Sequence, residues 1–180
     1  MTGDDAATGC ARLVELGFEP AATWHLAGEW LGYCYVEGVG DRMASRFAVS
    51  NALYAFCDGD HVLYIGKTSQ TLRKRLAGYC KPGSTQNTNR KCHALIKDAI
   101  NAGKVIEVLA FAPPEDLMFR GFAINLAGGL EDTLIGHFAP PWNGGSKAVK
   151  VTESAEREAG QLAEDRVMDD ALAEQPVEIA

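Results

Sequence analysis

The sequence lacks any long apolar run. Its longest apolar stretches extend over only a few residues, whereas a membrane-spanning helix needs roughly 20. The N-terminal residues include Asp4 and Asp5 where a secretory signal would have a basic segment followed by an apolar one. These absences predict a protein that is not exported, has no membrane partner and is located in the cytoplasm.

Cysteine and histidine spacings typical of metal sites are also missing. The five cysteines are odd in number and include no Cys-x-x-Cys pair, and the four histidines show no His-x-x-x-His spacing. The sequence therefore gives no indication of a zinc site. An odd number of dispersed cysteines favours reduced thiols, as in a cytosolic protein, over a disulfide framework.

Charge is unevenly distributed along the chain. The 180 residues carry 17 Lys and Arg against 24 Asp and Glu, a formal net charge of −7. Residues 151–180 hold nine of the acids and two of the bases, so the whole excess of negative charge lies there. Residues 62–104, by contrast, hold nine bases and one acid. This local excess of positive charge favours a nucleic-acid partner, although the chain as a whole is acidic.

The length suits one domain of ordinary size with additional segments. Residues 1–50 show no clean hydrophobic period beyond a short helical pattern that Gly17 ends, and we treat them as an N-terminal extension of unknown role. Residues 146–180 form an acidic tail without aromatic residues. Such a segment buries too little apolar surface to fold alone, so a disordered or helical tail is expected.

Residues 51–145 show the patterns of an α+β domain. Two β-rich runs flank the turn residues 58–60, and helical and strand patterns follow in alternation. In chain order, the expected elements are a helix over 6–16, strands over 53–57 and 61–65, a helix that Thr68 or Ser69 caps and Pro82 ends, a helix that Asn87, Thr88 or Asn89 caps and that ends at 103, a strand over 104–112 and a helix over 127–138. A small three-stranded antiparallel sheet flanked by helices is therefore predicted.

Two charged side chains fall on apolar helix faces. Arg75 lies within the apolar stripe formed by Leu72, Leu76 and Tyr79, and Glu131 lies beside the apolar face of the last helix. A buried guanidinium needs an anion because it cannot lose its charge. These residues alone leave two alternatives: an ion pair between Arg75 and Glu131 that joins two helices, or a phosphate or metal site.

An ordered set of residues bears on this choice. The set is Ala52-Leu53-Tyr54, then Tyr64-Ile65-Gly66, and then Lys67, Leu72, Arg75, Tyr79, Glu131 and Asn143. In this order and at these intervals it resembles the GIY-YIG nuclease superfamily, over residues 51–145. The resemblance implies an α+β nuclease domain and a divalent-metal-dependent DNA endonuclease. Two departures are Ala52, where the family has glycine, and one additional residue between Tyr64 and Arg75; Arg73 would leave the apolar stripe, so Arg75 is retained as the site arginine.

The resemblance also implies a catalytic site. Its residues would be Tyr54, Tyr64, Arg75, Tyr79, Glu131 and Asn143, to which we add Lys67 as a cation that favours the phenolate of Tyr54. Tyr54 would act as general base or position a water, and Asn143 would brace the site. Glu131 would be the metal ligand. Since it is the one acidic ligand of the set, one Mg²⁺ or Mn²⁺ ion with several waters fits better than a two-metal pair.

The basic segment supplies the expected DNA-binding surface. The residues placed on it are Arg73, Lys74, Arg90, Lys91 and Lys97. Phosphate contacts by about five basic side chains give a slope of log affinity against log salt concentration of about −4.5. One active site cuts one strand, so double-strand cleavage requires a homodimer or two binding events. The alternatives are a noncatalytic nucleic-acid-binding module with the same fold and a structure-specific repair nuclease.

The predicted hairpin provides a geometric test of the resemblance. With a two-residue turn at 58–59, paired residue numbers sum to 117, and Tyr54 and Tyr64 point to opposite faces of the sheet. A shared active site requires both phenols on one face. We therefore expect an odd-numbered loop centred on Gly59, or a bulge, with paired numbers that sum to 118.

Overall fold

The computed structural model describes residues 9–36, 51–114 and 117–144. Predictions for the acidic tail at 146–180, for residues 6–8 of the first helix and for the end of the N-terminal extension lie outside the described residues. All described elements belong to one compact unit. None of the helices in these ranges has the length and apolar character that a membrane crossing needs.

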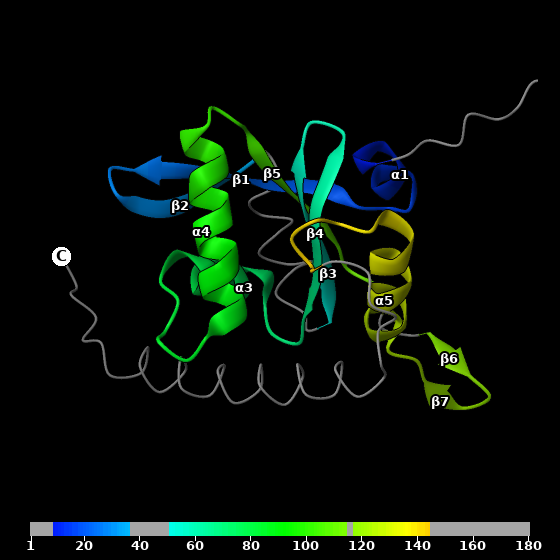
Figure 1. The fold of residues 1–180 in the computed structure, drawn as a ribbon. Coiled ribbons are helices and arrows are strands. Elements are labelled where there is room, and N and C mark those ends of the chain that lie inside the picture. Colours follow the sequence, from blue (N-terminus) through cyan, green and yellow to red (C-terminus); the bar gives the residue numbers. More distant parts are fainter. Residues whose placement is uncertain (1–8, 37–50, 115–116, 145–180) are drawn as a thin grey trace, which may run out of the picture. The chain divides into compact units, whose positions relative to one another are not determined.

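The described elements form an α+β fold (Figure 1). In chain order they are α1 (Cys10–Glu15), β1 (Glu19–Ala27), β2 (Trp30–Tyr35), β3 (Ala52–Asp58), β4 (His61–Thr68), α3 (Leu72–Cys80), α4 (Asn87–Asn101), β5 (Ile106–Phe111), β6 (Met118–Phe119), β7 (Phe122–Ala123) and α5 (Leu126–Phe138). The predicted α+β class, the central hairpin, the strand after it and the helices are confirmed to within a few residues at each end.

The main sheet has five strands in the order β2-β1-β5-β3-β4, and all pairs are antiparallel. The prediction of a three-stranded sheet is wrong, because β1 pairs with β5 and brings β2 with it. Both strands were missed because their side chains do not alternate cleanly between buried and exposed, and because the edge strand β2 is largely exposed. The β6–β7 hairpin forms a separate two-stranded sheet.

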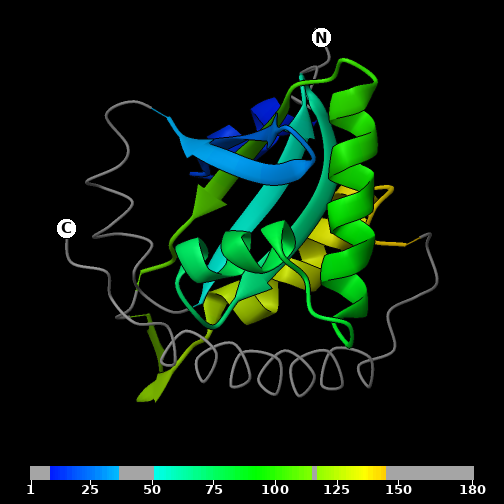
Figure 2. The ribbon, with the colours of Figure 1, turned by 90° about the vertical axis from the view of Figure 1, so that its left-hand side faces the viewer.

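Helices cover both faces of the main sheet. Figure 2, viewed from the side of α3 and α4, shows these helices in front of the sheet and α5 behind it. The buried side chains form two clusters: Tyr54, Phe56 and Ile96 belong to the cluster on the α3–α4 side, whereas Leu13 and Leu53 belong to the cluster on the α1–α5 side. The alternation of side chains along β3 therefore assigns Tyr54 to the α3–α4 face.

The β3–β4 hairpin contains a bulge. Asp58 pairs with His61 across a two-residue loop, and the register shifts between Phe56 and Cys57. Beyond the shift, Tyr54 pairs with Gly66 and Phe56 with Tyr64, so the paired numbers sum to 120. Because this sum is even, Tyr54 and Tyr64 lie on the same face. The predicted bulge and shared face are confirmed. The sum of 118 and the loop centred on Gly59 are wrong, because the loop consists of Gly59 and Asp60, which gives paired numbers that sum to 119, and the bulge adds one.

The helices α3 and α4 begin differently from the prediction. The N-cap of α3 is Thr71, whose Oγ1 accepts a hydrogen bond from Lys74 N at 3.2 Å. Thr68 cannot cap α3 because it is still part of β4. The residue before α4 is Gln86, whose side chain accepts a hydrogen bond from Gly83 N at 2.8 Å and makes no cap bond to the helix. The side chain of Gln86 thus stabilises the turn between the two helices.

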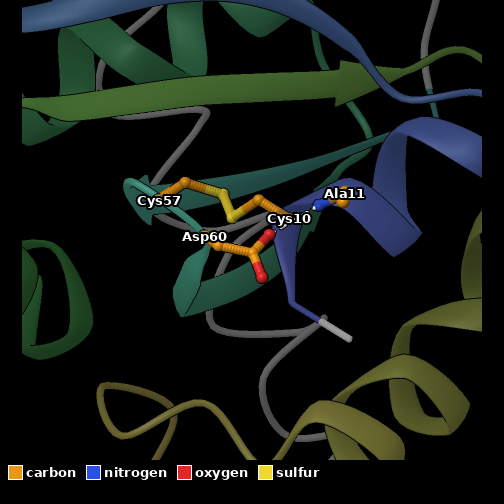
Figure 3. The surroundings of a disulfide bond; sticks show 4 residues. All are labelled: Cys10, Ala11, Cys57 and Asp60. Atoms are coloured by element: carbon orange, nitrogen blue, oxygen red, sulfur yellow. Dashed lines mark hydrogen bonds between the residues drawn. A yellow bond between two sulfur atoms is a disulfide. The ribbon is translucent and has the colours of Figure 1, made fainter. Parts of the chain in front are cut away.

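A disulfide joins α1 to the sheet (Figure 3). It connects Cys10 in α1 with Cys57 in β3, 47 residues apart, with a Cα–Cα distance of 6.5 Å. The prediction that all five cysteines are reduced thiols is therefore wrong for this pair. Cys34, Cys80 and Cys92 are free thiols. The sequence could not show the pairing, because it depends on how α1 packs against the sheet.

The β3–β4 turn holds the first residues of α1 in place. The main-chain oxygen of Asp60 accepts a hydrogen bond from Cys10 N at 3.0 Å, and its Oδ1 accepts one from Ala11 N at 2.9 Å. Asp60 thereby satisfies two amide groups that the helix itself leaves unpaired. Gly9 precedes the helix with φ 76°, and a Cβ at that position would overlap the main-chain oxygen of Asp60, so this approach requires glycine.

Candidate active site

Arg75 lies in a hydrogen-bonded cluster with two tyrosines on the α3–α4 side of the sheet. Its Nε donates to Tyr54 Oη at 2.8 Å, and its Nη2 donates to Tyr79 Oη at 2.8 Å. The two phenol oxygens are 2.7 Å apart and share a further hydrogen bond. Residues far apart in the sequence, on β3 and α3, thus form a closed triangle of polar groups, which we call the Arg75 cluster.

The local structure explains how these side chains meet. Arg75 and Tyr79 are four residues apart on α3, so they lie one above the other on the helix face that packs on the sheet. Tyr54 points toward that face from β3, and the ring of Tyr64 lies 6.1 Å from its ring. Tyr54 and Tyr79 are fully buried, whereas Tyr64 and Arg75 remain 7% and 8% exposed. All four residues are therefore buried, and Tyr64 and Arg75 are the least buried of them.

The charge of Arg75 is not neutralised by a carboxylate. Within the described part of the chain no acidic side chain pairs with the guanidinium, so the alternative of an ion pair with Glu131 is wrong. Burial lowers the pKa of Arg75, but the oxygens of Tyr54, Tyr79 and Tyr64 outweigh it and raise the pKa overall. Arg75 is therefore a buried cation.

The two bonded phenols are neutral at ordinary pH. Burial raises the pKa of Tyr54 and of Tyr79 above the ordinary value, and the nearby charge of Arg75 opposes this rise without reversing it. A neutral phenol can donate and accept hydrogen bonds, but it is a weak base. The chemistry available to Tyr54 is therefore to position a neighbouring group.

Gly66 leaves the space that the phenol of Tyr54 occupies. It lies directly opposite Tyr54 in the hairpin. A Cβ at this position would lie 2.7 Å from Tyr54 Oη and 2.8 Å from Tyr64 Cε1. The glycine of the Tyr-Ile-Gly sequence is therefore required by the close packing of the two aromatic side chains that the resemblance places in the site.

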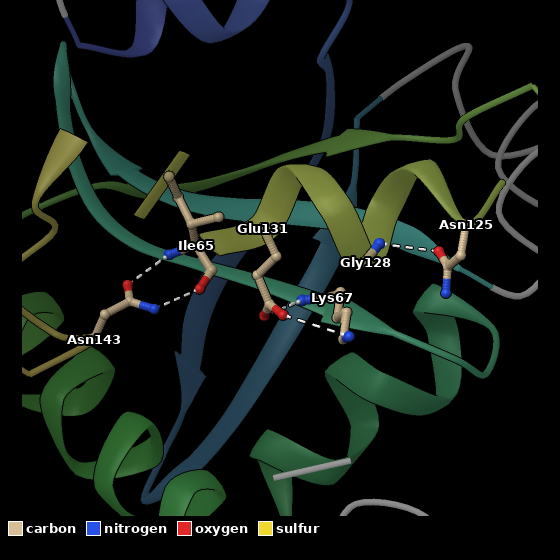
Figure 4. A network of polar contacts seen from close by, with 6 residues as sticks. All are labelled: Ile65, Lys67, Asn125, Gly128, Glu131 and Asn143. Atoms are coloured by element: carbon tan, nitrogen blue, oxygen red, sulfur yellow. Dashed lines mark hydrogen bonds and ion pairs between the residues drawn. The ribbon is translucent and has the colours of Figure 1, made fainter. Parts of the chain in front are cut away.

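A second group of polar contacts lies at the free edge of β4 (Figure 4). Glu131 on α5 accepts a hydrogen bond from Lys67 N through Oε1 at 3.1 Å, and its Oε2 lies 3.8 Å from Lys67 Nζ. The Glu131 and Lys67 side chains are 18% and 16% exposed. The cation that contacts the Tyr54 oxygen is thus Arg75, while the ammonium group of Lys67 lies beside Glu131.

Asn143 contacts the same edge two residues earlier along β4. Its Oδ1 accepts from Ile65 N at 2.9 Å, and its Nδ2 donates to Ile65 O at 2.6 Å. Trp142 N donates to Leu63 O at 2.9 Å. An edge strand presents unpaired amide and carbonyl groups, and these contacts satisfy those of alternate residues. The segment after α5 therefore closes the free edge of the sheet.

The run 64–67 connects the two groups. Tyr64 packs in the Arg75 cluster, Gly66 accommodates Tyr54, and Lys67 holds Glu131. In the described ranges no hydrogen bond or ion pair links the Arg75 cluster directly to Glu131. The predicted site residues thus form two groups that β4 connects, instead of one continuous network.

Glu131 is the predicted ligand for a divalent ion. Among the described residues, no three His, Cys, Asp or Glu side chains come together in a way that could hold a metal. Mg²⁺ commonly binds through one or two carboxylates, with waters and substrate phosphates as its other ligands. A part-exposed carboxylate fits an ion of this kind and does not fit a closed site made of protein ligands.

The basic residues that are predicted to bind DNA lie on α3 and α4. Arg73, Arg90 and Lys91 are exposed, and Lys74 and Lys97 are partly buried. Lys91 Nζ donates to Trp142 O at 3.0 Å, and Lys97 Nζ donates to Glu29 O at 2.8 Å. Two of these bases therefore also connect α4 to neighbouring segments of the fold.

Comparisons with known proteins place this fold. No model of a protein family matches the chain, and no curated protein sequence matches it. A mutant of bacteriophage T4 EndoII has a similar structure, with a TM-score of 0.53 and 25% sequence identity over 72% of this chain and 93% of that chain. The chain shares the fold of EndoII. The restriction endonuclease HPY188I in complex with product DNA is also similar, with a TM-score of 0.42 and 15% identity over 81% of this chain and 93% of that chain.

Sequence reasoning missed part of what surrounds the Arg75 cluster. Trp30 on β2 and His93 on α4 line a pocket with the last residues of α3. These residues come from three separate elements, and β2 was not predicted. The sequence contains Trp30, but its exposure and its position beside α3 and α4 are evident only once the strand order is known.

Proposed function

We propose that the chain is a divalent-metal-dependent DNA endonuclease of the GIY-YIG type, which hydrolyses phosphodiester bonds at one single-metal site. The observation that carries this proposal is the buried cation of Arg75, whose hydrogen-bond partners are neutral phenols. A buried charge without a counterion is costly, and a phosphate group supplies the missing anion. The fold shared with EndoII supports a nuclease.

The Arg75 cluster would bind and orient the scissile phosphate. The guanidinium of Arg75 stabilises the negative charge that develops on the phosphoryl oxygens. Tyr79 holds the guanidinium in place through its hydrogen bond to Nη2. Tyr54 remains neutral and accepts the hydrogen bond from Nε of the same guanidinium, so its role would be to position Arg75.

Glu131 would hold one Mg²⁺ or Mn²⁺ ion. An ion held there would supply positive charge for the departing 3′ oxygen, and cleavage at that oxygen would leave a 5′ phosphate on the product. The amide of Lys67 fixes one carboxylate oxygen of Glu131, and Asn143 holds Ile65, two residues earlier on β4. The contacts of Glu131 and Asn143 with β4 would fix α5 and the segment after it against the edge of the sheet. They would thereby fix the position of Glu131 relative to the Arg75 cluster.

Nicking of a supercoiled plasmid tests the proposal. The protein is incubated with plasmid DNA and Mg²⁺, with and without a chelator, and nicked circles are expected only with free metal. Glu131→Gln retains an oxygen that can accept the Lys67 amide but removes the negative charge. It is expected to abolish nicking while DNA binding persists. Asp132→Asn is the matched control, because it removes a neighbouring exposed charge of α5 and should nick at the normal rate.

Two results would contradict the proposal. Undiminished nicking by Glu131→Gln would remove Glu131 from the site. A wild-type protein that shifts plasmid DNA but never nicks it would be a noncatalytic binding module. Flap and bubble substrates, compared with plain duplex in the same assay, separate a structure-specific repair nuclease from one that cuts ordinary DNA. Conversion of nicked circles to linear DNA in one encounter would indicate a homodimer.

A further inference from the structure

A pocket of about 750 Å³ lies between the β1–β2 turn, the end of α3 and the middle of α4. Its volume is within the range of pockets that hold small ligands, roughly 300–1,000 Å³. Trp30, Lys81, His93 and Lys97 are among its lining residues. The pocket is separate from the contacts that join Glu131 and Asn143 to β4.

Trp30 is the aromatic residue that lines this pocket together with His93. Its side chain is 67% exposed, the largest such fraction among the described tryptophans, although it belongs to a strand of the main sheet. Lys81 Nζ lies 5.9 Å from the centre of its ring. An exposed indole next to a cation is a combination that binds nucleic-acid strands, because a base stacks on the ring while the cation contacts the phosphate.

Positive groups outnumber negative ones around the pocket. Two lysines, Lys81 and Lys97, line it together with one acid, Glu29, and with His93. Lys97 Nζ donates one hydrogen bond to Glu29 O at 2.8 Å, so two of its three N–H donors remain for a ligand. His93 Nδ1 lies 2.8 Å from Tyr79 O, and since a carbonyl only accepts, Nδ1 carries the proton. The second ring nitrogen, Nε2, is left for another partner.

Tyr79 links the pocket to the candidate active site. Its carbonyl oxygen bonds His93 of the pocket, while its phenol bonds Arg75. The pocket and the Arg75 cluster are therefore separated by a single residue, Tyr79. The bases of a duplex are stacked on one another, so only a single-stranded or extruded nucleotide exposes a base face to Trp30.

We propose that this pocket binds one unpaired nucleotide of a DNA strand, with its base stacked on Trp30 and its phosphate at Lys81 and Lys97. The proposal rests on the proposed nuclease function and adds a substrate feature to it. It predicts that the protein prefers DNA with an unpaired nucleotide near the cleaved bond over fully paired DNA.

Binding to a labelled oligonucleotide tests the proposal. Fluorescence anisotropy is measured with the full chain, a chelator and no divalent ion, using one single strand and the duplex of the same sequence. Trp30→Leu is expected to weaken single-strand binding by roughly 5- to 150-fold, the usual effect of losing one base stack, and to leave duplex binding unchanged. Trp30→Phe should retain most of the affinity. Lys81→Gln should reduce the salt slope by about 1.

The controls separate this proposal from general electrostatics and from the nuclease proposal. Arg12→Gln removes one exposed positive charge from α1, on the other side of the sheet, and should leave single-strand affinity unchanged. Thermal unfolding verifies that each variant is folded. Three results would overturn the pocket proposal. The first is that Trp30→Leu binds the single strand as tightly as the wild type, and the second is that it loses affinity for the duplex to the same extent as for the single strand. The third is that the wild type does not bind the single strand. Plasmid nicking tests catalysis independently, because the binding assay contains no metal.

Discussion

Substitution of Gly66 by alanine is expected to destabilise the protein strongly. The added Cβ would lie 2.7 Å from Tyr54 Oη and 2.8 Å from Tyr64 Cε1. Tyr54 can move only by losing a hydrogen bond, since it is fully buried and its oxygen is bonded to Arg75 and Tyr79. Overpacking costs about 1–3 kcal/mol, and the loss of one hydrogen bond adds about 1 kcal/mol, so the free energy of unfolding should fall by about 2–4 kcal/mol.

Substitution of a glycine of α5 by alanine should have the opposite effect on the free energy of unfolding. Gly129 lies within the helix, and a Cβ there would meet no atom within 4 Å. Alanine is more favourable than glycine in a helix interior by about 1 kcal/mol. Gly129→Ala is therefore expected to raise the free energy of unfolding by about 0.5–1 kcal/mol, and it is the matched control for Gly66→Ala.

Urea unfolding followed by tryptophan fluorescence measures both effects. Thermal unfolding is a second measurement of the same two variants. For a protein of this size each kcal/mol corresponds to a shift in the thermal unfolding midpoint of about 2–4 °C, so the midpoints of the two variants should differ by several degrees or more. Plasmid nicking should also fall in Gly66→Ala, because a displaced Tyr54 releases Arg75. A Gly66→Ala protein with a midpoint at or above that of the wild type would refute the packing argument for the Tyr-Ile-Gly sequence.

Three further predictions concern other parts of the structure. Reduction of the Cys10–Cys57 bond should lower the free energy of unfolding by about 2–4 kcal/mol, since it frees a long loop, and urea unfolding with and without reductant measures this. Burial raises the pKa of Cys92 from 9.0 to about 11, so as the pH rises the unfolded chain loses this thiol proton before the folded protein does. The free energy of unfolding should therefore keep its full value below pH 9 and decrease between pH 9 and about 11. The decrease should be smaller in Cys92→Ala. Asn143→Ala removes both side-chain bonds to Ile65 and should destabilise by about 1–3 kcal/mol in the same assay, whereas an unchanged midpoint would show that the β4 edge needs no such cover.

Much of the local structure was predictable because it follows from short-range patterns. The apolar stripe of α3 correctly assigned Leu72, Leu76 and Tyr79 to one buried face, together with Arg75. The requirement that Tyr54 and Tyr64 share a face correctly predicted a bulge, although the sequence could not place it. Each of these inferences uses residues close together along the chain, whose relative positions are set by the backbone geometry of helices and strands.

The partners of individual side chains were not predictable in the same way. The sequence suggested Glu131 as the counterion of Arg75, but the tertiary structure pairs Arg75 with two phenols and Glu131 with Lys67. The periodicity of a helix assigns a side chain to a face and says nothing of which residue it meets there. That choice depends on the register of β4 and on the packing of α3 and α5 on opposite sides of the sheet.

The amino-acid pattern alone thus determines the α+β class, the central hairpin, the helices around it and a set of residues that resembles a nuclease. Only the folded chain shows that the sheet has five strands, that α1 is joined to β3 by a disulfide, and that Arg75 is a buried cation between neutral phenols. The physical reason is that periodicity records which side of an element faces the core. Strand order, cross-links and the hydrogen-bond partners of a buried charge depend on contacts between distant segments, and these contacts form only when the elements pack together.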